Sequence, residues 1–177
     1  MNIEEFKSEV GRLGIAVTDR EIDLLERYYE LLIEYNEKIN LTAITDKQEV
    51  FLKHFYDSLT LVRVIDFNEI ESMCDIGTGA GFPGVVIKIF YPNVKLTLVD
   101  ALNKRINFLN VVSESLGLEG ITLVHARAEE YAKDNREKFD LVTARAVAKT
   151  STLLEYSMPI VKKNKYFVAM KGHDDTE

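Results

Sequence analysis

The sequence predicts an α/β fold, a parallel sheet with flanking helices, preceded by a helical segment. The first observation is a change of hydrophobic period near residue 72. Apolar residues before it recur at helical spacing, and strand patterns alternate with helical ones after it. The second is that four of the nine glycines fall within residues 77–84, directly after the first strand pattern. Strands that alternate with helices favour right-handed crossovers and therefore a parallel sheet.

Residues 1–71 are predicted to form a helical subdomain, because they contain no proline and their apolar spacing is helical. Thr18 and Glu21 form a capping box that opens a long helix, and Asp46 and Glu49 repeat the pattern before the next one. The residues that mark the three helices are Ile3, Phe6 and Val10; Ile22, Leu25, Tyr29 and Leu32, which share one face; and Val50, Phe51, His54, Phe55, Leu59 and Val62.

Residues 72–177 are predicted to form the sheet domain, because five β patterns occur there with helical patterns between them. The expected strands are Ser72–Ile76, Val94–Asp100, Ile121–Val124, Phe139–Ala144 and Tyr166–Met170. The expected helices are Gly84–Phe90, Lys104–Leu116, Ala128–Lys133 and Ser151–Val161.

Composition excludes several classes of protein. The 177 residues are 46% hydrophobic and 29% charged, which excludes a disordered or fibrous chain. No run approaches the roughly 20 apolar residues that span a bilayer, and the acidic first ten residues have no signal-peptide core. One cysteine, Cys74, and three scattered histidines predict neither a disulfide nor a metal site. We therefore expect a cytoplasmic protein that contacts no membrane and holds no metal.

The net charge of −7 argues against indiscriminate binding to nucleic acids. The acidity is uneven, because residues 1–71 contain 8 Lys+Arg and 16 Asp+Glu. The sheet domain is therefore close to neutral, and a local basic face there could still hold a nucleic-acid substrate.

The glycine run between Asp75 and Gly84 predicts a ligand site. Glycines between a strand and a helix let a backbone approach a ligand, and the helix start offers free amides. The spacing Gly79-x-Gly81-x-x-Gly84 also satisfies the dinucleotide fingerprint. An acid beside the loop repels a pyrophosphate but suits an ammonium group. S-adenosylmethionine carries an ammonium group and has no phosphate, so Asp75 favours this donor over NAD.

Three more candidates follow later strands of the predicted sheet. Asp100 ends the second strand, where a carboxylate can accept hydrogen bonds from ribose hydroxyls. Its alternative role is to cap the following helix. Glu129 and Glu130 lie just after the third strand, where methyltransferases commonly place an acid near the adenine edge. Their alternative role is to form the solvated acidic start of a helix. Arg145 ends the fourth strand between small residues and is expected to face the same cleft.

Two kinds of methyl transfer are disfavoured by what the sequence contains. Its three prolines, Pro83, Pro92 and Pro159, form no Pro-Pro pair, so the Asp/Asn-Pro-Pro-aromatic loop of exocyclic-amine methyltransferases is absent. Methylation of pyrimidine carbon 5 needs a thiolate nucleophile. Cys74 is predicted inside a strand, where it is more simply a small buried residue.

Several motifs in order resemble the bacterial small-subunit ribosomal RNA guanine-N7 methyltransferase family, also called glucose-inhibited division protein B. The resemblance covers residues 20 to about 172. It rests on a set of motifs in a fixed order, which is more specific than any single motif. The motifs are Asn40-Leu41-Thr42-Ala43-Ile44, His54-Phe55-Tyr56-Asp57-Ser58-Leu59, the Asp75–Gly84 loop, Lys104-Arg105 with Phe108-Leu109, Arg127-Ala128-Glu129-Glu130, Ala144-Arg145-Ala146 and Lys171-Gly172.

The resemblance implies a class I S-adenosylmethionine-dependent methyltransferase fold, Rossmann-like, with a helical extension. It also implies S-adenosylmethionine as donor and a guanine of 16S rRNA, in the small ribosomal subunit, as acceptor. Family donor contacts would fall on Gly77, Phe82, Ala128, Glu129 and Arg145. The donor-binding set expected from loop and resemblance together is Asp75, Gly77, Gly79, Gly81, Phe82, Asp100, Ala128, Glu129 and Arg145.

Guanine N7 has a free lone pair and no proton to lose, so the expected mechanism is positioning without a general base. Arg145 is the candidate catalytic residue that touches both donor and acceptor. The lysines and arginine expected along the RNA path are Lys104, Arg105, Lys149 and Lys171. The alternatives are a small NAD-binding oxidoreductase and a non-catalytic module that binds the ribosome.

Family chains continue past the Lys171-Gly172 motif with an antiparallel strand pair and a basic tail. This sequence stops at Glu177, so the final strand pair is expected to be missing. We expect the edge of the last strand, Tyr166–Met170, to be bare, which leads either to dimerisation through that edge or to disorder near the C-terminus. We also expect weaker methylation of the ribosomal subunit, since phosphate contacts supply much of the affinity for RNA.

Overall fold

The computed structural model describes residues 1–145 and 150–170, and its centre is one parallel sheet of five strands in the order β3-β2-β1-β4-β5. The α/β prediction is therefore confirmed. The strands are β1 Ser72–Ile76, β2 Lys95–Asp100, β3 Ile121–His125, β4 Phe139–Arg145 and β5 Val161–Met170. The helices that connect them are α5 Gly84–Phe90, α6 Asn103–Ser115, α7 Ala128–Asp134 and α8 Thr150–Ser157.

The largest difference from the predicted elements lies before the last strand. The helix expected to reach Val161 ends at Ser157, and a 3₁₀ turn that contains Pro159 follows it. Proline lacks the N–H that continues an α-helix. β5 then begins at Val161 instead of Tyr166, and its register against β4 shifts between Phe139 and Leu141.

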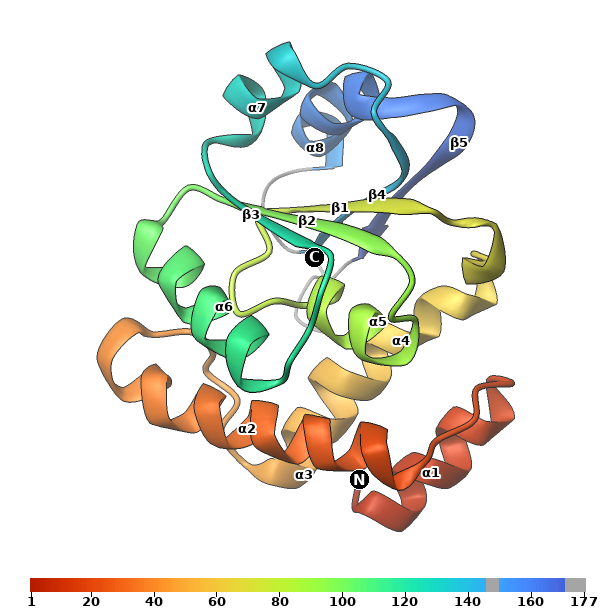
Figure 1. Cartoon of the computed structure of the whole chain (residues 1–177), viewed down its shortest axis with the longest axis vertical. Helices are drawn as coiled ribbons and strands as arrows, with labels where there is room; N and C mark the ends of the chain where they lie inside the picture. The colour runs from red at the N-terminus through yellow and green to blue at the C-terminus, as the bar shows by residue number, and fades with distance from the viewer. Residues whose placement is uncertain (146–149, 171–177) are drawn as a thin grey trace.

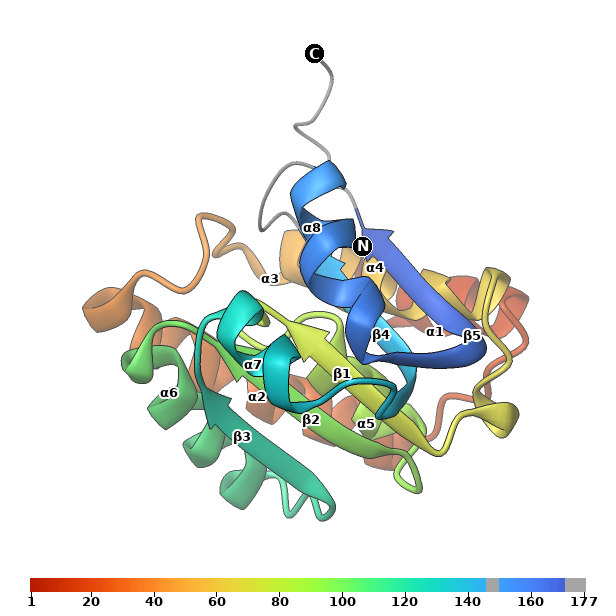
Figure 2. The same cartoon turned by 90° about the horizontal axis from the view of Figure 1, so that it is seen from above.

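The two faces of the sheet hold two hydrophobic clusters. Alternate strand residues point to opposite faces, so Met73 and Leu98 belong to one cluster and Cys74 and Val99 to the other. Figure 1 shows α5 and α6 on one side of the sheet and α7 and α8 on the other. Figure 2 views the sheet from above, with β3 and β5 at opposite edges. Cys74 is fully buried, as the strand pattern predicts.

The N-terminal residues form the expected helices, but the third helix changes pitch along its length. α1 spans Ile3–Arg12 and α2 spans Asp19–Ile39. A continuous helical stretch then runs through α3 Lys47–Val50, a π-helical turn Phe51–Tyr56, α4 Asp57–Leu59 and a 3₁₀ turn Thr60–Arg63. A further 3₁₀ turn, Phe67–Glu69, precedes β1. π-Helical turns are rare and concentrate at functional sites.

Helix α2 buries Tyr28, not the predicted Tyr29, and this corrects the predicted core face. Tyr28 has no exposed surface, packs against both Phe55 and Phe82, and donates a hydrogen bond to the carbonyl of Ala80. Tyr29 lies at the edge of the buried stripe and donates to the Thr45 carbonyl at 2.7 Å. Residues three apart after Ile22 and Leu25 continue to Tyr28, which favours the observed face.

The N-terminal helices share one hydrophobic cluster with α5, α6 and the sheet, so the boundary near residue 71 is not a break in the core. Arg20 donates to the Ile89 carbonyl at 3.1 Å, and Arg27 donates to the Ser115 hydroxyl at 3.0 Å. The two contacts join α2 to α5 and α6, the helices that cover one face of the sheet. Among the described residues, no helix is long and apolar enough to cross a membrane.

Candidate functional site

A cavity of about 370 Å³ opens where β1, β2 and β4 end, at the carboxyl edge of the sheet. Ligands of open parallel sheets bind at this edge. The cavity is lined by Leu41, His54, Gly77, Thr78, Gly79, Ala80, Phe82, Asp100, Ala101, Leu102, Arg105 and Arg145. Five of the predicted donor-binding residues are among them: Gly77, Gly79, Phe82, Asp100 and Arg145.

The loop between β1 and α5 presents backbone to the cavity through Gly77 and Gly79. Both adopt positive φ, 61° and 59°. The Thr78 N–H donates to the carbonyl of Val99 at 3.1 Å, which ties the loop to β2. Nothing lies within 4 Å of the place where a Cβ on Gly79 would stand. Gly79 therefore leaves open space for a ligand.

Gly81 and Gly84 face the protein interior and not the cavity. A Cβ on Gly81 would lie 2.5 Å from the Tyr28 hydroxyl, and one on Gly84 would lie 2.6 Å from a methyl group of Leu98. Both glycines are thus required by close packing within the fold. This differs from the expectation that Gly81 contacts the donor.

Asp75 braces the glycine loop from below. Its Oδ2 accepts hydrogen bonds from the Thr78 hydroxyl at 2.8 Å and the Gly84 N–H at 3.0 Å. Its Oδ1 accepts from the Thr143 hydroxyl at 3.0 Å. The side chain is fully buried and does not line the cavity, where a contact with an ammonium group was expected. Burial raises the pKa of Asp75 to about 7, although the three hydrogen bonds oppose the shift.

Asp100 lines the cavity and also shapes its floor. Its Oδ2 accepts from the Gly79 N–H at 2.9 Å, and its Oδ1 accepts from the Leu102 N–H at 2.9 Å. The second contact resembles the capping alternative, although Leu102 itself is the N-cap of α6. Arg105 Nη1 lies 3.6 Å from Asp100 Oδ2, so this predicted RNA contact turns toward the cavity.

Of the remaining predicted residues, those that the structure describes lie apart from the cavity lining. Ala128 and Glu129 begin α7, which follows β3, the strand next to β2. Lys104 is exposed in the first turn of α6. Lys149 and Lys171 lie outside the described residues.

Arg145 is held by residues from the N-terminal segment. Its Nη2 donates to the carbonyl of Lys53 at 3.1 Å and to His54 Nδ1 at 2.9 Å. Its guanidinium carbon lies 5.8 Å from the centre of the Phe82 ring. Burial lowers the pKa of Arg145, whereas the charges of Asp57 and Asp75 raise it. Nη1 is buried with no hydrogen-bond partner among the described residues.

His54 was not predicted as a site residue, yet it lines the cavity. Its ring stacks on Phe82 with 4.4 Å between centroids and 9° between planes. Its Nε2 lies 2.9 Å from the Thr42 hydroxyl. Burial, with the charges of Arg145 and Lys53, lowers the pKa of His54 to about 3. The only sequence signal was its place in a motif of the resembling family, and that motif carried no chemistry of its own.

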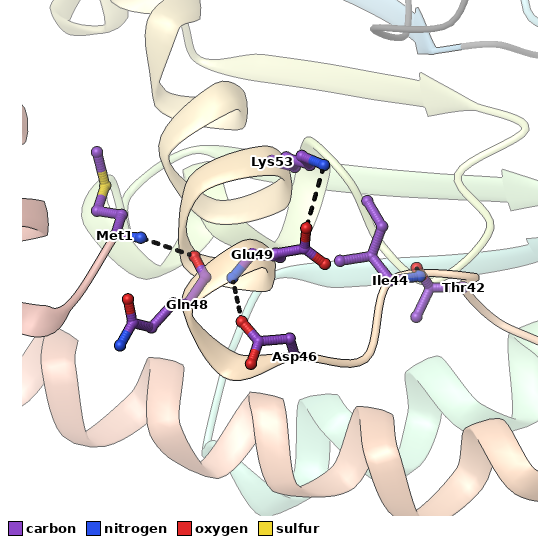
Figure 3. A network of polar contacts seen from close by, with 7 residues as sticks. All are labelled: Met1, Thr42, Ile44, Asp46, Gln48, Glu49 and Lys53. Atoms are coloured by element: carbon purple, nitrogen blue, oxygen red, sulfur yellow. Dashed lines mark hydrogen bonds and ion pairs between the residues drawn. The ribbon is translucent and has the colours of Figure 1, made fainter.

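Short-range contacts fix the segment that carries His54, as Figure 3 shows. The Thr42 hydroxyl accepts from the Ile44 N–H at 3.0 Å, and Asp46 Oδ1 accepts from the Glu49 N–H at 3.0 Å. Lys53 Nζ lies 3.4 Å from Glu49 Oε1, one turn along the same helical stretch. Figure 3 also shows the Met1 ammonium group donating to the Gln48 carbonyl, at 3.3 Å. These contacts tie the first residue to the helical stretch that carries His54.

The hydrogen-bonding groups that line the cavity fit S-adenosylmethionine. Asp100 offers carboxylate oxygens to ribose hydroxyls, and the glycine loop offers an open backbone. Arg145 Nη1 and Arg105 Nε are buried N–H groups without a partner among the described residues. Buried donors are costly when unpaired, so both favour a ligand with acceptor oxygens. Among those residues, no group of three or more His, Cys, Asp or Glu could hold a metal.

Asp100→Ala is expected to lower the affinity for S-adenosylhomocysteine by about 1–3 kcal/mol, because it removes charge-assisted hydrogen bonds. Isothermal titration measures this. The matched control is Asp66→Ala. Asp66 Oδ1 accepts from the N–H of Asn68, two residues on, as Asp100 does from Leu102, but Asp66 does not line this cavity. Equal affinity in both variants would show that Asp100 only shapes the turn.

Comparison with known sequences gives the family. The model of the rRNA small subunit methyltransferase G family (GidB) matches residues 21–177. The ribosomal RNA small subunit methyltransferase G of Bacillus subtilis is 54% identical over 174 residues, which are 97% of this chain and 73% of that protein. The protein of the same name from Exiguobacterium sibiricum is 51% identical over the same shares.

Solved structures show the same fold at low sequence identity. An S-adenosylmethionine-dependent methyltransferase from Aquifex aeolicus superposes with a TM-score of 0.54 at 17% identity, covering 77% of this chain and 71% of that one. A precorrin-6y C5,15-methyltransferase from Geobacter metallireducens superposes with a TM-score of 0.53 at 18% identity, covering 74% and 64%. The sheet therefore has the class I methyltransferase fold. The family model and the relatives from Bacillus subtilis and Exiguobacterium sibiricum show that the chain belongs to the rRNA small subunit methyltransferase G family.

Proposed function

We propose that this chain transfers the methyl group of S-adenosylmethionine to N7 of a guanine in the 16S rRNA of the small ribosomal subunit. The observation that carries the proposal is the cavity at the carboxyl edge. It joins a carboxylate for ribose, an open glycine loop and a buried arginine in a chain of the rRNA small subunit methyltransferase G family. An rRNA substrate would place the reaction in the cytoplasm.

Asp100 would accept from the ribose hydroxyls of the donor, and the backbone at Gly77 and Gly79 would lie along its sulfur-bearing arm. Ala128 and Glu129, one strand beyond Asp100, would lie on the adenine side. S-adenosylmethionine supplies an electrophilic methyl group when bound. The protein residues then have to orient this donor and exclude water around it.

The polar residues of the cavity agree with an acceptor that has no proton to lose. Guanine N7 offers a lone pair, so a general base is not needed. The histidine that lines the cavity, His54, is engaged at Nδ1 by Arg145, and its pKa is lowered to about 3. A group that is already hydrogen-bonded at its basic nitrogen is poorly suited to remove a proton. The arrangement therefore favours catalysis by positioning.

The RNA is expected to approach over exposed Lys104, with Lys149 and Lys171 as further candidate phosphate contacts. A chain with a net charge of −7 needs such local cations to hold a polyanion. Arg105 is better placed to act at the cavity mouth, because it already lies beside Asp100.

The test is single-turnover methylation of 30S subunits that lack the modification, with radiolabelled S-adenosylmethionine and chemical cleavage at N7-methylguanine. We expect label at one guanine of 16S rRNA. Label on another atom would refute the N7 assignment. Binding of S-adenosylhomocysteine with no label would favour the non-catalytic ribosome-binding alternative, and tighter binding of NAD would favour the oxidoreductase alternative.

We also propose that β5 can mediate self-association. Among the described strands, β5 pairs with β4 on one side only, and Tyr166 is 43% exposed. Unpaired strand edges recruit other strands, whereas lysine on an edge strand opposes this. We therefore assign the association to Tyr166–Met170, the half of β5 that follows its three lysines. We expect a dimer in sedimentation equilibrium that Tyr166→Lys shifts to monomer. Val64→Lys, at an apolar site 67% exposed elsewhere, should leave it intact. A monomeric parent chain would contradict the proposal.

A further inference from the structure

Arg145 has one half of its guanidinium fully engaged and the other half without a partner. Nη2 donates to two acceptors, the carbonyl of Lys53 and Nδ1 of His54, at 3.1 and 2.9 Å. Nη1 is buried and has no partner among the described residues. Leaving a buried charged donor unpaired costs more than leaving a neutral one. The cavity that Arg145 lines is where Nη1 can find an acceptor.

The hydrogen bonds of His54 define its tautomer. Arginine has only donors, so His54 Nδ1 must be the acceptor and carry no proton. The proton of the neutral ring is therefore on Nε2, which donates to the Thr42 hydroxyl at 2.9 Å. That hydroxyl oxygen also accepts from the Ile44 N–H. A protonated ring would place a second N–H against the guanidinium, so this geometry requires the neutral form.

Packing against Phe82 also fixes the orientation of the His54 ring. The ring lies nearly parallel to Phe82, and only 7% of the residue is exposed. The Ser58 hydroxyl donates to the His54 carbonyl at 2.6 Å, one helical turn along. The turn that carries both Lys53 and His54 is the π-helical one. Its local geometry therefore presents two acceptors side by side to a single nitrogen of Arg145.

We infer that His54 is a positioning residue, which holds Nη2 of Arg145 so that Nη1 meets the carboxylate of the donor's amino-acid arm. The inference rests on the proposed function, because it takes S-adenosylmethionine as the donor. It also gives the N-terminal segment a part in donor binding, since Thr42, Lys53 and His54 all precede the sheet.

The order of the strands supports the carboxylate as the partner of Nη1. Asp100 ends β2 and Arg145 ends β4, with β1 and its glycine loop between them. Two strand spacings separate the ends, roughly 10 Å. A donor whose ribose lies on Asp100 and whose arm crosses the glycine loop therefore directs its amino-acid end to Arg145. A guanidinium and a carboxylate form one of the strongest hydrogen-bonded pairs in proteins.

Two variants separate the two nitrogens of His54. In His54→Asn the amide oxygen can replace Nδ1 as acceptor, whereas in His54→Gln the longer side chain reaches the Nε2 position. Both lose the stacking on Phe82, so each controls for the ring. The probes are S-adenosylhomocysteine, which has the carboxylate, and 5′-methylthioadenosine, which lacks it. Isothermal titration measures both, and thermal unfolding checks that each variant is folded.

We expect His54→Gln to lower the affinity for S-adenosylhomocysteine about tenfold, as for loss of a charge-assisted hydrogen bond. The affinity of His54→Gln for 5′-methylthioadenosine should equal that of the parent chain. His54→Asn should retain most of the affinity for both ligands. Equal losses for both ligands, or unchanged S-adenosylhomocysteine affinity in His54→Gln, would overturn the inference.

Nitrogen-15 NMR of the parent chain provides a readout that needs neither variant nor ligand. His54 should be neutral at pH 7 with its proton on Nε2, and a proton on Nδ1 would overturn the inference. The two proposals can fail separately. If the ligand pattern holds but 30S subunits gain no label, only the proposed function fails. If the subunits are labelled and the pattern is absent, only the role of His54 fails.

Discussion

Gly79→Val should abolish detectable binding of S-adenosylhomocysteine. Gly79 lines the cavity at a φ of 59°, and no atom lies within 4 Å of where its Cβ would stand. The valine side chain would therefore meet no protein atom there and would occupy the space of the ligand. We expect a loss of roughly 100-fold or more, which corresponds to about 3 kcal/mol. Isothermal titration measures the affinity directly.

The control for this variant is Gly117→Val. Gly117 has a similar φ of 63°, and nothing lies within 4 Å of its Cβ position, but it follows α6 and does not line the cavity. A side chain at positive φ costs of order 1–3 kcal/mol of stability, and both variants should suffer that loss. Only Gly79→Val should lose the ligand. If Gly117→Val loses it too, or Gly79→Val keeps it, the open space at Gly79 is not the ligand path.

The sheet domain could be predicted from the sequence because its elements follow local patterns. The β runs and the glycine loop define β1 to β4 to within about one residue at either end. The final helix and strand were placed less well, because Pro159 and a register shift near Leu141 are effects of packing that periodicity does not carry. The choice between Tyr28 and Tyr29 also depended on packing, since the two are adjacent in the sequence and only Tyr28 is fully buried in the structure.

The candidate site could be predicted where its residues follow strands. The carboxyl ends of β1, β2 and β4 meet at one edge of the sheet. Asp100 and Arg145 end two of these strands, and Gly77 and Gly79 follow the third. His54 could not be found in this way, because it comes from a π-helical turn in the N-terminal segment. Its place beside Arg145 depends on how α2 and the helical stretch before β1 pack on the sheet.

Asp75 shows a different limit of sequence reasoning. The residue type and its place before the glycines suggested contact with a cationic ligand. The side chain instead points under the loop, where hydrogen bonds from Thr78, Gly84 and Thr143 replace water. A sequence pattern can place a carboxylate at a strand end, but it does not show which side of the loop the carboxylate faces.

This burial has a measurable consequence, because the pKa of Asp75 is raised from 3.8 to about 7 in the folded chain. The folded state then binds the proton more tightly than the unfolded state does. Between about pH 4 and pH 7 it carries more protons at this site, so the free energy of unfolding falls as the pH rises. The contribution is fully present below about pH 4 and is lost by the time the pH has passed through about 7.

Asp75→Asn should remove this pH dependence. The asparagine oxygen can still accept from the Gly84 N–H, and the side chain has no proton to lose in this range. Other titrating groups, including His54, are present in both proteins, so they largely cancel in the difference. The stability of the parent chain minus that of Asp75→Asn should fall with pH by up to about 1.4 kcal/mol per unit. Urea unfolding of both proteins in steps from about pH 4 to about pH 8 measures it. A difference that rises with pH would mean that the three hydrogen bonds outweigh burial and hold the folded carboxylate ionised.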